Sequence, residues 1–320
     1  MRPAARLRER GLRATPAVAG VALLLLAACG GGQRGGQSAN SSGSATRSPA
    51  SAAPGSASPA VPGHRYVSFT SYPGWIQGSI PPAQFDYTPW TIISDFGLWP
   101  APGGGIAVGD MQSLANIPPA VAAAHQARRL IIMAVGEQGQ GARFASAASP
   151  AHRAAFIRAI VSYVAKYHFD GVDIDWEEEV PAHQADYAAL VSGVRSALDQ
   201  AFPGRHLYLS ADVNPGQVPP PIAARIAPYV DSLNDESFQD NGAGSIAAYL
   251  RAGIPASKLL IGIGVAPGYY DTTVARVAAK VKYVQQHGLA GTLFWQPGNL
   301  HTYRTDPRLV PLRQMVNIPG

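Results

Sequence analysis

The chain has 320 residues, of which 47% are hydrophobic and 14% are charged. This apolar content is enough for a sizeable core in one large domain or two small ones. The formal net charge of +5 comes largely from arginines before residue 15, and the remainder of the chain is close to neutral. A nucleic-acid-binding protein is therefore not indicated. A single cysteine excludes an intramolecular disulfide and a cysteine metal site.

The first residues have the pattern of an export signal. Arginines precede an apolar stretch over 17–28, which is shorter than the roughly 20 residues of a membrane span. The run Leu26-Ala27-Ala28-Cys29 resembles a bacterial lipobox. It predicts a signal peptide over 1–28 and lipidation of Cys29, and hence a protein that is anchored at the cell surface or secreted. An ordinary signal peptide with an incidental cysteine, or a true membrane anchor, is the alternative.

Residues 29–62 are rich in Gly, Ser, Ala and Pro and hold few large apolar residues. Such a segment buries too little surface to offset the entropy of ordering it, so a flexible tether is expected.

The composition changes from residue 63 onward, where short β-branched or aromatic runs alternate with amphipathic stretches. The expected strands are 65–70, 91–96, 129–135, the acidic run near 170–177, 207–211, 229–233, 259–264 and 291–295. The expected helices are 116–128, 150–167, 183–201, 218–228, 244–253, 271–287 and 307–316. This order predicts one catalytic (β/α)8 TIM barrel over 63–320. The alternative fold is an open doubly wound sheet. It is disfavoured because this sequence has no Gly-rich phosphate-binding motif after the first expected strand.

The acidic run is the most informative stretch of the chain. Val172, Ile174 and Trp176 alternate with three acids, Asp173, Asp175 and Glu177. One face of this strand is therefore apolar and the other is a row of acids, which is costly to bury without shared protons or partners.

In a barrel this row points inward and ends at the carboxyl edge of the strands, where active sites form. Asp173 then lies deepest and Glu177 lies at the rim. A glycosidase needs a carboxylic acid that protonates the leaving oxygen. Since neighbouring acids push their pKa values apart, Glu177 is expected to be this acid.

The pattern Asp170-x-x-Asp173-x-Asp175-x-Glu177 resembles the signature of glycoside hydrolase family 18, which includes chitinases and endo-β-N-acetylglucosaminidases. The resemblance implies retaining, substrate-assisted cleavage of β-1,4 bonds next to an N-acetylhexosamine, in chitin, peptidoglycan or an N-glycan core. Glu177 would be the acid and base, Asp175 would orient the acetamido group, and Asp173 would share a proton with Asp175. Trp295 resembles the aromatic residue on which the sugar stacks in this family. The alternative is a tryptophan that only packs in the core at the end of a strand.

Two segments depart from the family pattern. The third strand ends Ala134-Val135-Gly136-Glu137 where the family has Ser-x-Gly-Gly, so Asp173 lacks one usual partner. Phe238 stands where the family has a tyrosine that donates to the acetamido carbonyl, and phenylalanine cannot donate. The residues predicted to bind substrate are Trp295, Phe238, Gln239 and Tyr269. Candidates for the missing hydroxyl are Tyr269, Tyr270 and Tyr208.

The remaining predictions concern support and partners. Asp170, at the start of the acidic strand, and Gly136 are assigned structural roles, and Glu178 and Glu179 are expected outside the working face. The spacing of the acids does not fit a calcium loop, so no metal and no cofactor are expected. The expected partners are a glycan that contains N-acetylglucosamine and, through the lipid, a membrane, with the chain acting as a monomer. Two alternatives are a glycan-binding protein without activity on the same fold and a periplasmic-type solute receptor.

Overall fold

The computed structural model describes residues 61, 63–109, 112–300 and 303–318. The chain divides into two units, Met1–Ala53 and Pro54–Gly320, and every described residue belongs to the second. The predicted signal peptide and nearly all of the predicted tether therefore lie outside the described residues, as does Cys29. Within the described part, no helix is both long and apolar enough to cross a membrane.

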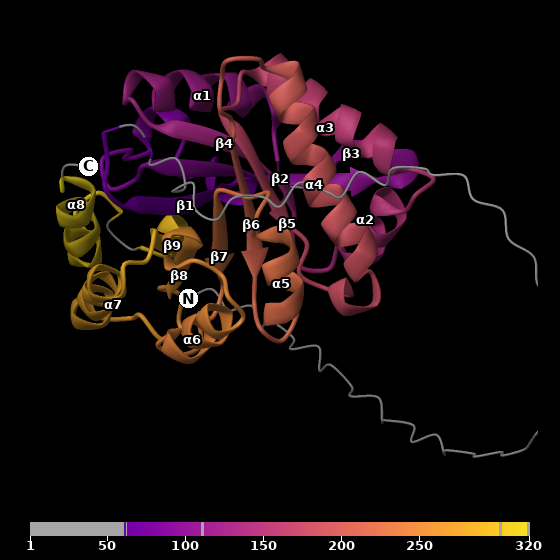
Figure 1. Cartoon of the computed structure of the whole chain (residues 1–320). Coiled ribbons are helices and arrows are strands. Elements are labelled where there is room, and N and C mark those ends of the chain that lie inside the picture. The colour runs from indigo at the N-terminus through magenta and orange to yellow at the C-terminus, as the bar shows by residue number, and fades with distance from the viewer. Residues whose placement is uncertain (1–60, 62, 110–111, 301–302, 319–320) are drawn as a thin grey trace, which may run out of the picture. The chain divides into compact units, whose positions relative to one another are not determined.

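Eight parallel strands form a closed barrel, because β1 pairs with both β2 and β9. In order around the barrel, the strands are β1 (Val67–Pro73), β2 (Ile92–Ala101), β4 (Leu130–Gly136), β5 (Gly171–Asp175), β6 (Tyr208–Val213), β7 (Ser232–Asp235), β8 (Leu259–Gly264) and β9 (Gly291–Trp295). Helices lie around these strands (Figure 1). The predicted TIM barrel is confirmed.

The helices that cover the barrel follow most of its strands. They are α1 (Ile117–Gln126), α2 (Gly141–Ala148), α3 (Arg153–Tyr167), α4 (Gln184–Ala201), α5 (Pro220–Ile226), α6 (Ala243–Arg251), α7 (Val274–His287) and α8 (Val310–Val316). The connection from β1 to β2 contains only two short 3-10 turns, Gly74–Ile76 and Pro82–Gln84. This barrel thus lacks an α-helix after its first strand.

Two elements were not expected from the sequence. A short strand, β3 (Gly105–Val108), folds back antiparallel on the end of β2. Helix α2 follows β4, and its Phe144 stacks on Trp176 with ring centroids 5.0 Å apart and planes 6° apart. Both elements are short, and Phe144 depends on a residue far along the chain for its packing, which explains why local periodicity did not reveal them.

The sixth strand of the barrel, β7, begins later along the chain than the sequence predicts. The sequence predicts residues 229–233, whereas β7 covers Ser232–Asp235. Tyr229 is 40% exposed, and pairing starts where Ser232 lies opposite Ser210 of β6. The apolar residues at 229–230 therefore lie in the segment that leads into β7 and not in the strand itself.

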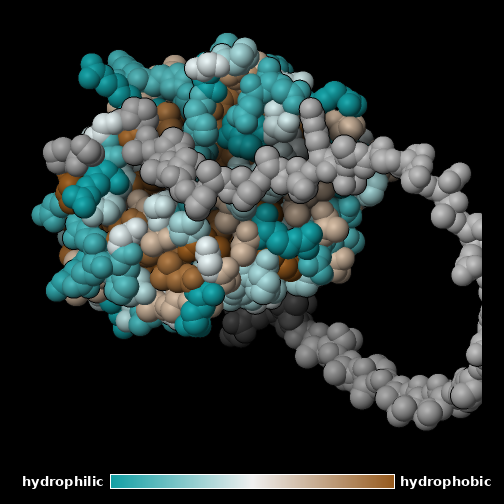
Figure 2. All heavy atoms as spheres, in the orientation of Figure 1, coloured by the Kyte–Doolittle hydropathy of each residue, from teal (hydrophilic) through white to brown (hydrophobic). Residues whose placement is uncertain are grey.

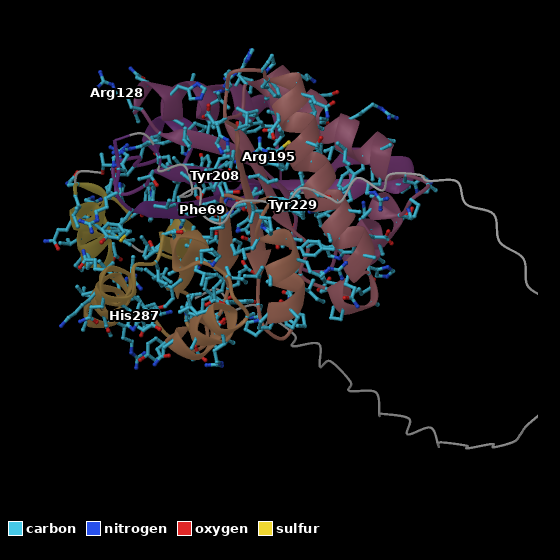
Figure 3. The ribbon with its side chains drawn as sticks, viewed as in Figure 1. Phe69, Arg128, Arg195, Tyr208, Tyr229 and His287 are labelled. Atoms are coloured by element: carbon cyan, nitrogen blue, oxygen red, sulfur yellow. The ribbon has the colours of Figure 1, made fainter. Side chains whose placement is uncertain are left out.

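Inside the barrel, the character of the side chains changes along the axis. The lower level is apolar and includes Phe69, Ile92, Tyr208 and Leu260, all buried in one cluster. Figure 3 shows Phe69 and Tyr208 among the strands, while Arg128 and His287 lie at the periphery. The next level toward the carboxyl ends is polar. The acids therefore lie toward the carboxyl ends of the strands, where the active sites of such barrels form.

The outer face of the strands packs against the helices. Val172, Ile174 and Trp176 belong to the large outer core, which confirms the apolar side of the acidic strand. On the face shown in Figure 2, hydrophobic and hydrophilic side chains are interspersed. The large hydrophobic side chains that are exposed in the described part are few: Val108, Tyr229, Val274 and Val310.

Candidate active site

A pocket of about 460 Å³ opens at the carboxyl ends of the barrel strands. Four acids and several aromatic and amide side chains line it, and no lysine, arginine or histidine is among the described residues of its wall. The lining residues are Trp75, Phe96, Glu137, Gln138, Asp175, Glu177, Asn214, Gln217, Glu236, Phe238, Gln239, Tyr269 and Trp295. A concave site with converging acids at this end of a barrel is the usual place for catalysis.

Asp173 lies below the pocket and is 1% exposed. Its Oδ1 accepts hydrogen bonds from Ser210 Oγ at 2.6 Å and from Asn234 Nδ2 at 3.3 Å. Ser94 Oγ donates to its Oδ2 at 3.1 Å. Burial raises the pKa of Asp173 to about 6, and the two serines oppose that rise. These partners from β2, β6 and β7 stand in for the serine that is missing from the third strand.

Asp175 lies one step closer to the opening and is 2% exposed. Its Oδ1 is buried and has no hydrogen-bond partner among the described residues. Burial raises the pKa of Asp175 well above its ordinary value, and the charges of Asp212 and Glu236 raise it further. Asp175 is therefore a carboxyl group that holds a proton readily and keeps one oxygen free for a ligand.

Glu177 follows the end of β5 and is partly buried at the pocket wall. Burial raises the pKa of Glu177, while hydrogen bonds with Asp175 and Gln217 lower it. A carboxyl group that has a raised pKa and faces a pocket suits a general acid. The structure thus brings the three predicted catalytic residues together on one inward face.

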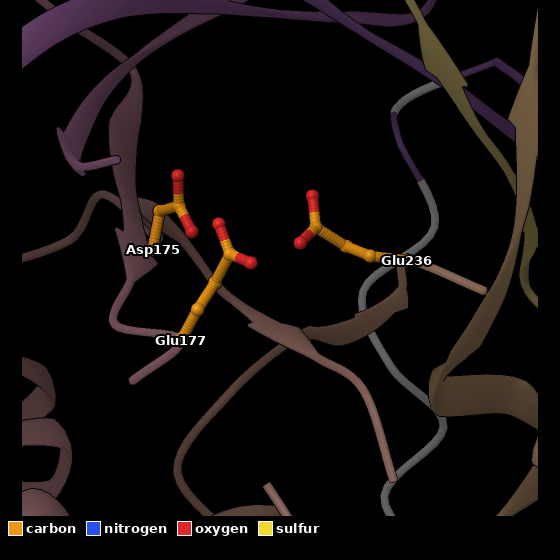
Figure 4. A group of neighbouring side chains, drawn as sticks. All are labelled: Asp175, Glu177 and Glu236. Atoms are coloured by element: carbon orange, nitrogen blue, oxygen red, sulfur yellow. The ribbon is translucent and has the colours of Figure 1, made fainter. Parts of the chain in front are cut away.

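Two further acids share this space and were not singled out from the sequence. Asp212 on β6 is 4% exposed and accepts a hydrogen bond from Asn234 Nδ2 at 2.8 Å. Glu236 follows β7, and Figure 4 shows its carboxyl group facing those of Asp175 and Glu177. One oxygen from each of these three groups lies within 4.8 Å of the others.

A signal for both acids does exist in the sequence. Ser210 and Asp212 are two residues apart on β6, so their side chains lie on the same, inward face of the strand. Asn234 and Glu236 are related in the same way at the end of β7. Reading the period of these strands as closely as that of the acidic strand would have identified both residues.

Aromatic rings form another wall of the pocket. Trp295, at the end of β9, meets Trp75 at 6.1 Å and Phe96 at 5.7 Å between ring centroids, both edge to face. Phe238 stacks on Tyr269, with centroids 5.6 Å apart. All four residues predicted to bind substrate, Trp295, Phe238, Gln239 and Tyr269, line this one pocket.

Comparison with known proteins identifies the family. Residues 91–274, more than half of the chain, match the model for glycosyl hydrolases family 18. The chain belongs to family 18.

Sequence relatives within family 18 include chitinases. Over 178 residues, the chain is 29% identical to Chitinase A1 of Niallia circulans, covering 41% of this chain and 26% of that protein. It is 28% identical over 152 residues to Chitinase 1 of Aphanocladium album, covering 37% and 36%. A chitinase-like effector of Moniliophthora roreri is 23% identical over 60% of this chain and 56% of its own length. The chain thus matches between about a quarter and about half of these relatives.

Solved structures share the fold of this family 18 chain at low identity. The class V chitinase from Nicotiana tobaccum superimposes with a TM-score of 0.69 at 16% identity, over 79% of this chain and 99% of that one. A chitinase from Cycas revoluta in complex with (GlcNAc)3 gives 0.66 at 16%, over 78% and 98%. A chitinase-like agglutinin from Robinia pseudoacacia gives 0.68 at 16%, over 78% and 99%. Solved structures of chitinases and of a chitinase-like agglutinin therefore share this barrel fold.

The two residues assigned structural roles lie at opposite ends of β5: Asp170 precedes its first residue, and Gly136 pairs with its last residue, Asp175. Asp170 Oδ2 accepts a hydrogen bond from the Ile131 amide at 2.9 Å and lies 2.8 Å from His125 Nε2. Gly136 has φ +131°, and a Cβ there would lie 1.9 Å from the carbonyl oxygen of Asp175. Glu178 points away from the acidic row, since its carboxylate accepts from the Gly139 amide at 2.8 Å.

The acids of the pocket are also the one group among the described residues that could hold a metal ion: Asp175, Glu177 and Glu236. They offer three carboxylate oxygens, whereas Ca²⁺ takes about six to eight oxygen ligands. The chemistry proposed below needs only the protons of these groups.

Proposed function

We propose that this family 18 chain hydrolyses β-1,4 glycosidic bonds next to an N-acetylhexosamine, with retention of configuration. The observation that carries the proposal is the hydrogen-bonded pair of Asp175 and Glu177 at the pocket, with a raised pKa at both carboxyl groups. Such a pair can supply a proton at the pocket wall and an acceptor beside it.

In the proposed reaction, Glu177 protonates the glycosidic oxygen as the bond from that oxygen to the anomeric carbon breaks. The oxygen of the substrate's own 2-acetamido group attacks the anomeric carbon and forms an oxazolinium-type intermediate. Asp175 orients the acetamido group, and Asp173 lies below it on the same face. Glu177, now a carboxylate, then takes a proton from the water that opens the intermediate. Family 18 is an exception to the mechanism in which two enzyme carboxylates act, one of them as nucleophile.

The wall of the pocket supports a sugar ring as the ligand. The ring of Trp295 is partly exposed at the end of β9, where a sugar could stack on it while its acetamido group points toward Asp175. The neighbouring Cycas revoluta chitinase binds (GlcNAc)3, which supports a chitooligosaccharide as the first ligand to test. Peptidoglycan and N-glycan cores contain the same sugar and are the other candidates.

The second candidate is a glycan-binding protein without hydrolytic activity. The fold shared with the Robinia pseudoacacia agglutinin favours considering it. Family 18 members that become lectins usually lose the glutamate at the position of Glu177, which this chain retains. We therefore favour the enzyme.

The experiment that tests the proposed reaction compares two substrates of equal length. Chitotetraose and cellotetraose differ in the acetamido group at carbon 2, so substrate-assisted hydrolysis predicts cleavage of the first alone. Inhibition by an oxazoline mimic is expected as well. Equal cleavage of both tetramers would contradict acetamido participation, and binding of chitotetraose without cleavage would favour the glycan-binding protein.

We also propose that Cys29 is lipidated and holds the barrel outside the cytoplasmic membrane. The lipobox-like run before Cys29 supports this. Replacing Cys29→Ser is expected to move the protein from the membrane fraction to the soluble fraction. Membrane association that persists in this variant would contradict the anchor.

A further inference from the structure

The proposed reaction leaves two acids of the pocket without a role, Glu137 and Glu236; Glu137 accepts a hydrogen bond from Trp99 Nε1 at 2.7 Å, and Glu236 is the one considered further. It follows β7, which only β6 separates from β5, and its carboxyl group faces those of Asp175 and Glu177 in the pocket (Figure 4). No side chain or backbone group among the described residues donates a hydrogen bond to this carboxyl group. Glu236 is half-buried and lines the pocket, so its carboxyl group is free to bond a ligand there.

Several acids lie around Glu236. Asp175 and Glu177 face it from β5 and the residues after it, Asp212 faces it from β6, and Asp173 lies below. Asp235 precedes it on β7, and Tyr269 lies on the neighbouring wall. In the described part of the chain, no lysine, arginine or histidine lines the pocket. Burial and these negative charges raise the pKa of Glu236 well above its ordinary value, so the neutral acid is favoured.

A neutral carboxylic acid differs from a carboxylate because it can donate a hydrogen bond. An acetamido group needs both kinds of partner, an acceptor for its N–H and a donor for its C=O. Asp175 serves as the acceptor in the proposed reaction. Phe238, on the same side of the pocket as Glu236, has no polar atom that could serve as the donor.

We propose that Glu236, as the neutral acid, contacts the substrate and donates a hydrogen bond to the carbonyl oxygen of its 2-acetamido group. This inference rests on the proposed function, since it assigns a second contact to the same reacting group. An amide oxygen has two lone pairs, so one attacks the anomeric carbon while the other accepts from Glu236 and fixes the direction of attack. The proton stays on Glu236 throughout, and the proton that reaches the leaving oxygen still comes from Glu177.

A matched pair of variants separates donation from shape. Glu236→Gln keeps the size of the side chain and an N–H donor, whereas Glu236→Met keeps the length and removes the donor. With a chitobiose aryl glycoside and the full-length chain, Glu236→Met is expected to lower kcat/KM about 100-fold, as loss of one preorganised donor does. Glu236→Gln is expected to stay within about threefold of the unsubstituted protein, because its amide N–H donates in place of the carboxylic O–H. Exposed Glu179→Gln removes an acid that lies outside the pocket, and it controls for the change in net charge.

The pH dependence of binding provides a readout that a merely structural role would not change. In a Glu177→Gln background, chitotetraose affinity is measured by calorimetry from pH 5 to pH 9. The donor exists below the pKa of Glu236 and is lost above it, so affinity is expected to fall with rising pH. The Glu177→Gln/Glu236→Gln protein is expected to lose this fall, because an amide does not titrate. Circular dichroism of each variant confirms that the barrel is folded.

Three results would overturn the inference: Glu236→Met as active as the unsubstituted protein, Glu236→Gln as impaired as Glu236→Met, or the same fall in affinity with and without Glu236. Failure of the proposed function looks different, because the unsubstituted protein would then cleave no N-acetylglucosamine oligomer. The binding comparison tests Glu236 in that case too, and absence of any chitotetraose binding would overturn both.

Discussion

Ser210 Oγ donates a hydrogen bond of 2.6 Å to Oδ1 of Asp173, across the boundary between β6 and β5. The two residues are register partners on adjacent strands and both point into the barrel. The deepest acid of the motif is therefore held by a neighbouring strand, and not by the serine of the third strand that the family pattern suggests.

Replacing Ser210→Ala is expected to leave this buried carboxyl group without its shortest hydrogen bond. The free energy of unfolding should fall by about 1–3 kcal/mol, the usual cost of leaving a buried polar group unsatisfied. The pKa of Asp173 should rise further, because the lost bond favours the charged form. Urea unfolding measures the first effect. Exposed Ser196→Ala on α4 is the control, and equal stability of the two variants would contradict this role of Ser210.

Gly136→Ala is expected to damage the site through the backbone. A Cβ at residue 136 would lie 1.9 Å from the carbonyl oxygen of Asp175, so β4 and β5 would have to separate. We expect a loss of more than about 3 kcal/mol, above the range for backbone strain alone. Gly139→Ala in the same connection is the control, since it has φ +87° and no atom within 4 Å of the added Cβ. Thermal unfolding compares them, and similar melting temperatures would contradict the steric argument.

Stability should depend on pH through buried acids such as Asp95. Burial raises the pKa of Asp95 to about 7, although Gln77 and Gln112 donate to its Oδ1 at 2.8 Å and 3.2 Å. The folded protein then holds this proton from pH about 4 to 7 while the unfolded chain releases it. The contribution to stability is present below pH 4 and is lost as pH rises to 7, at up to about 1.4 kcal/mol per pH unit.

The variant Asp95→Asn removes this titration. The difference in unfolding free energy between Asp95→Asn and the unsubstituted protein should therefore change by that slope between pH 4 and pH 7, in favour of the variant as pH rises. Urea unfolding at a series of pH values measures it. A difference that is constant with pH would show that Asp95 does not titrate in this window.

The sequence predicted the parts of the site that depend on a single strand. The alternation in 172–177 placed Asp173, Asp175 and Glu177 on one face, and the order of strands placed that face inside a barrel. The partners of these acids could not be read in the same way. Ser94 and Ser210 meet Asp173 through the register of the closed sheet, over 79 and 37 residues of sequence.

Glu236 and Asp212 escaped notice for a related reason. Asp212 lies near the end of β6 and Glu236 follows the end of β7, and the pairing of β5 with β6 and of β6 with β7 brings them to the acids of β5. Helix α2 is a similar case, because Phe144 is buried against Trp176 of a later strand. The local sequence pattern thus predicts the strands and the acidic row. The hydrogen bonds and charges around that row come from residues far apart in the sequence.

The central claim is that Glu177 is the acid and base of a glycoside hydrolase. The most direct test replaces Glu177→Gln and measures both hydrolysis and binding of chitotetraose. The account predicts that kcat falls by at least about 10²–10⁴-fold, the usual contribution of a general acid, while the dissociation constant changes little. The exposed Glu179→Gln should keep full activity. Hydrolysis by Glu177→Gln at the rate of the unsubstituted protein would contradict the assignment.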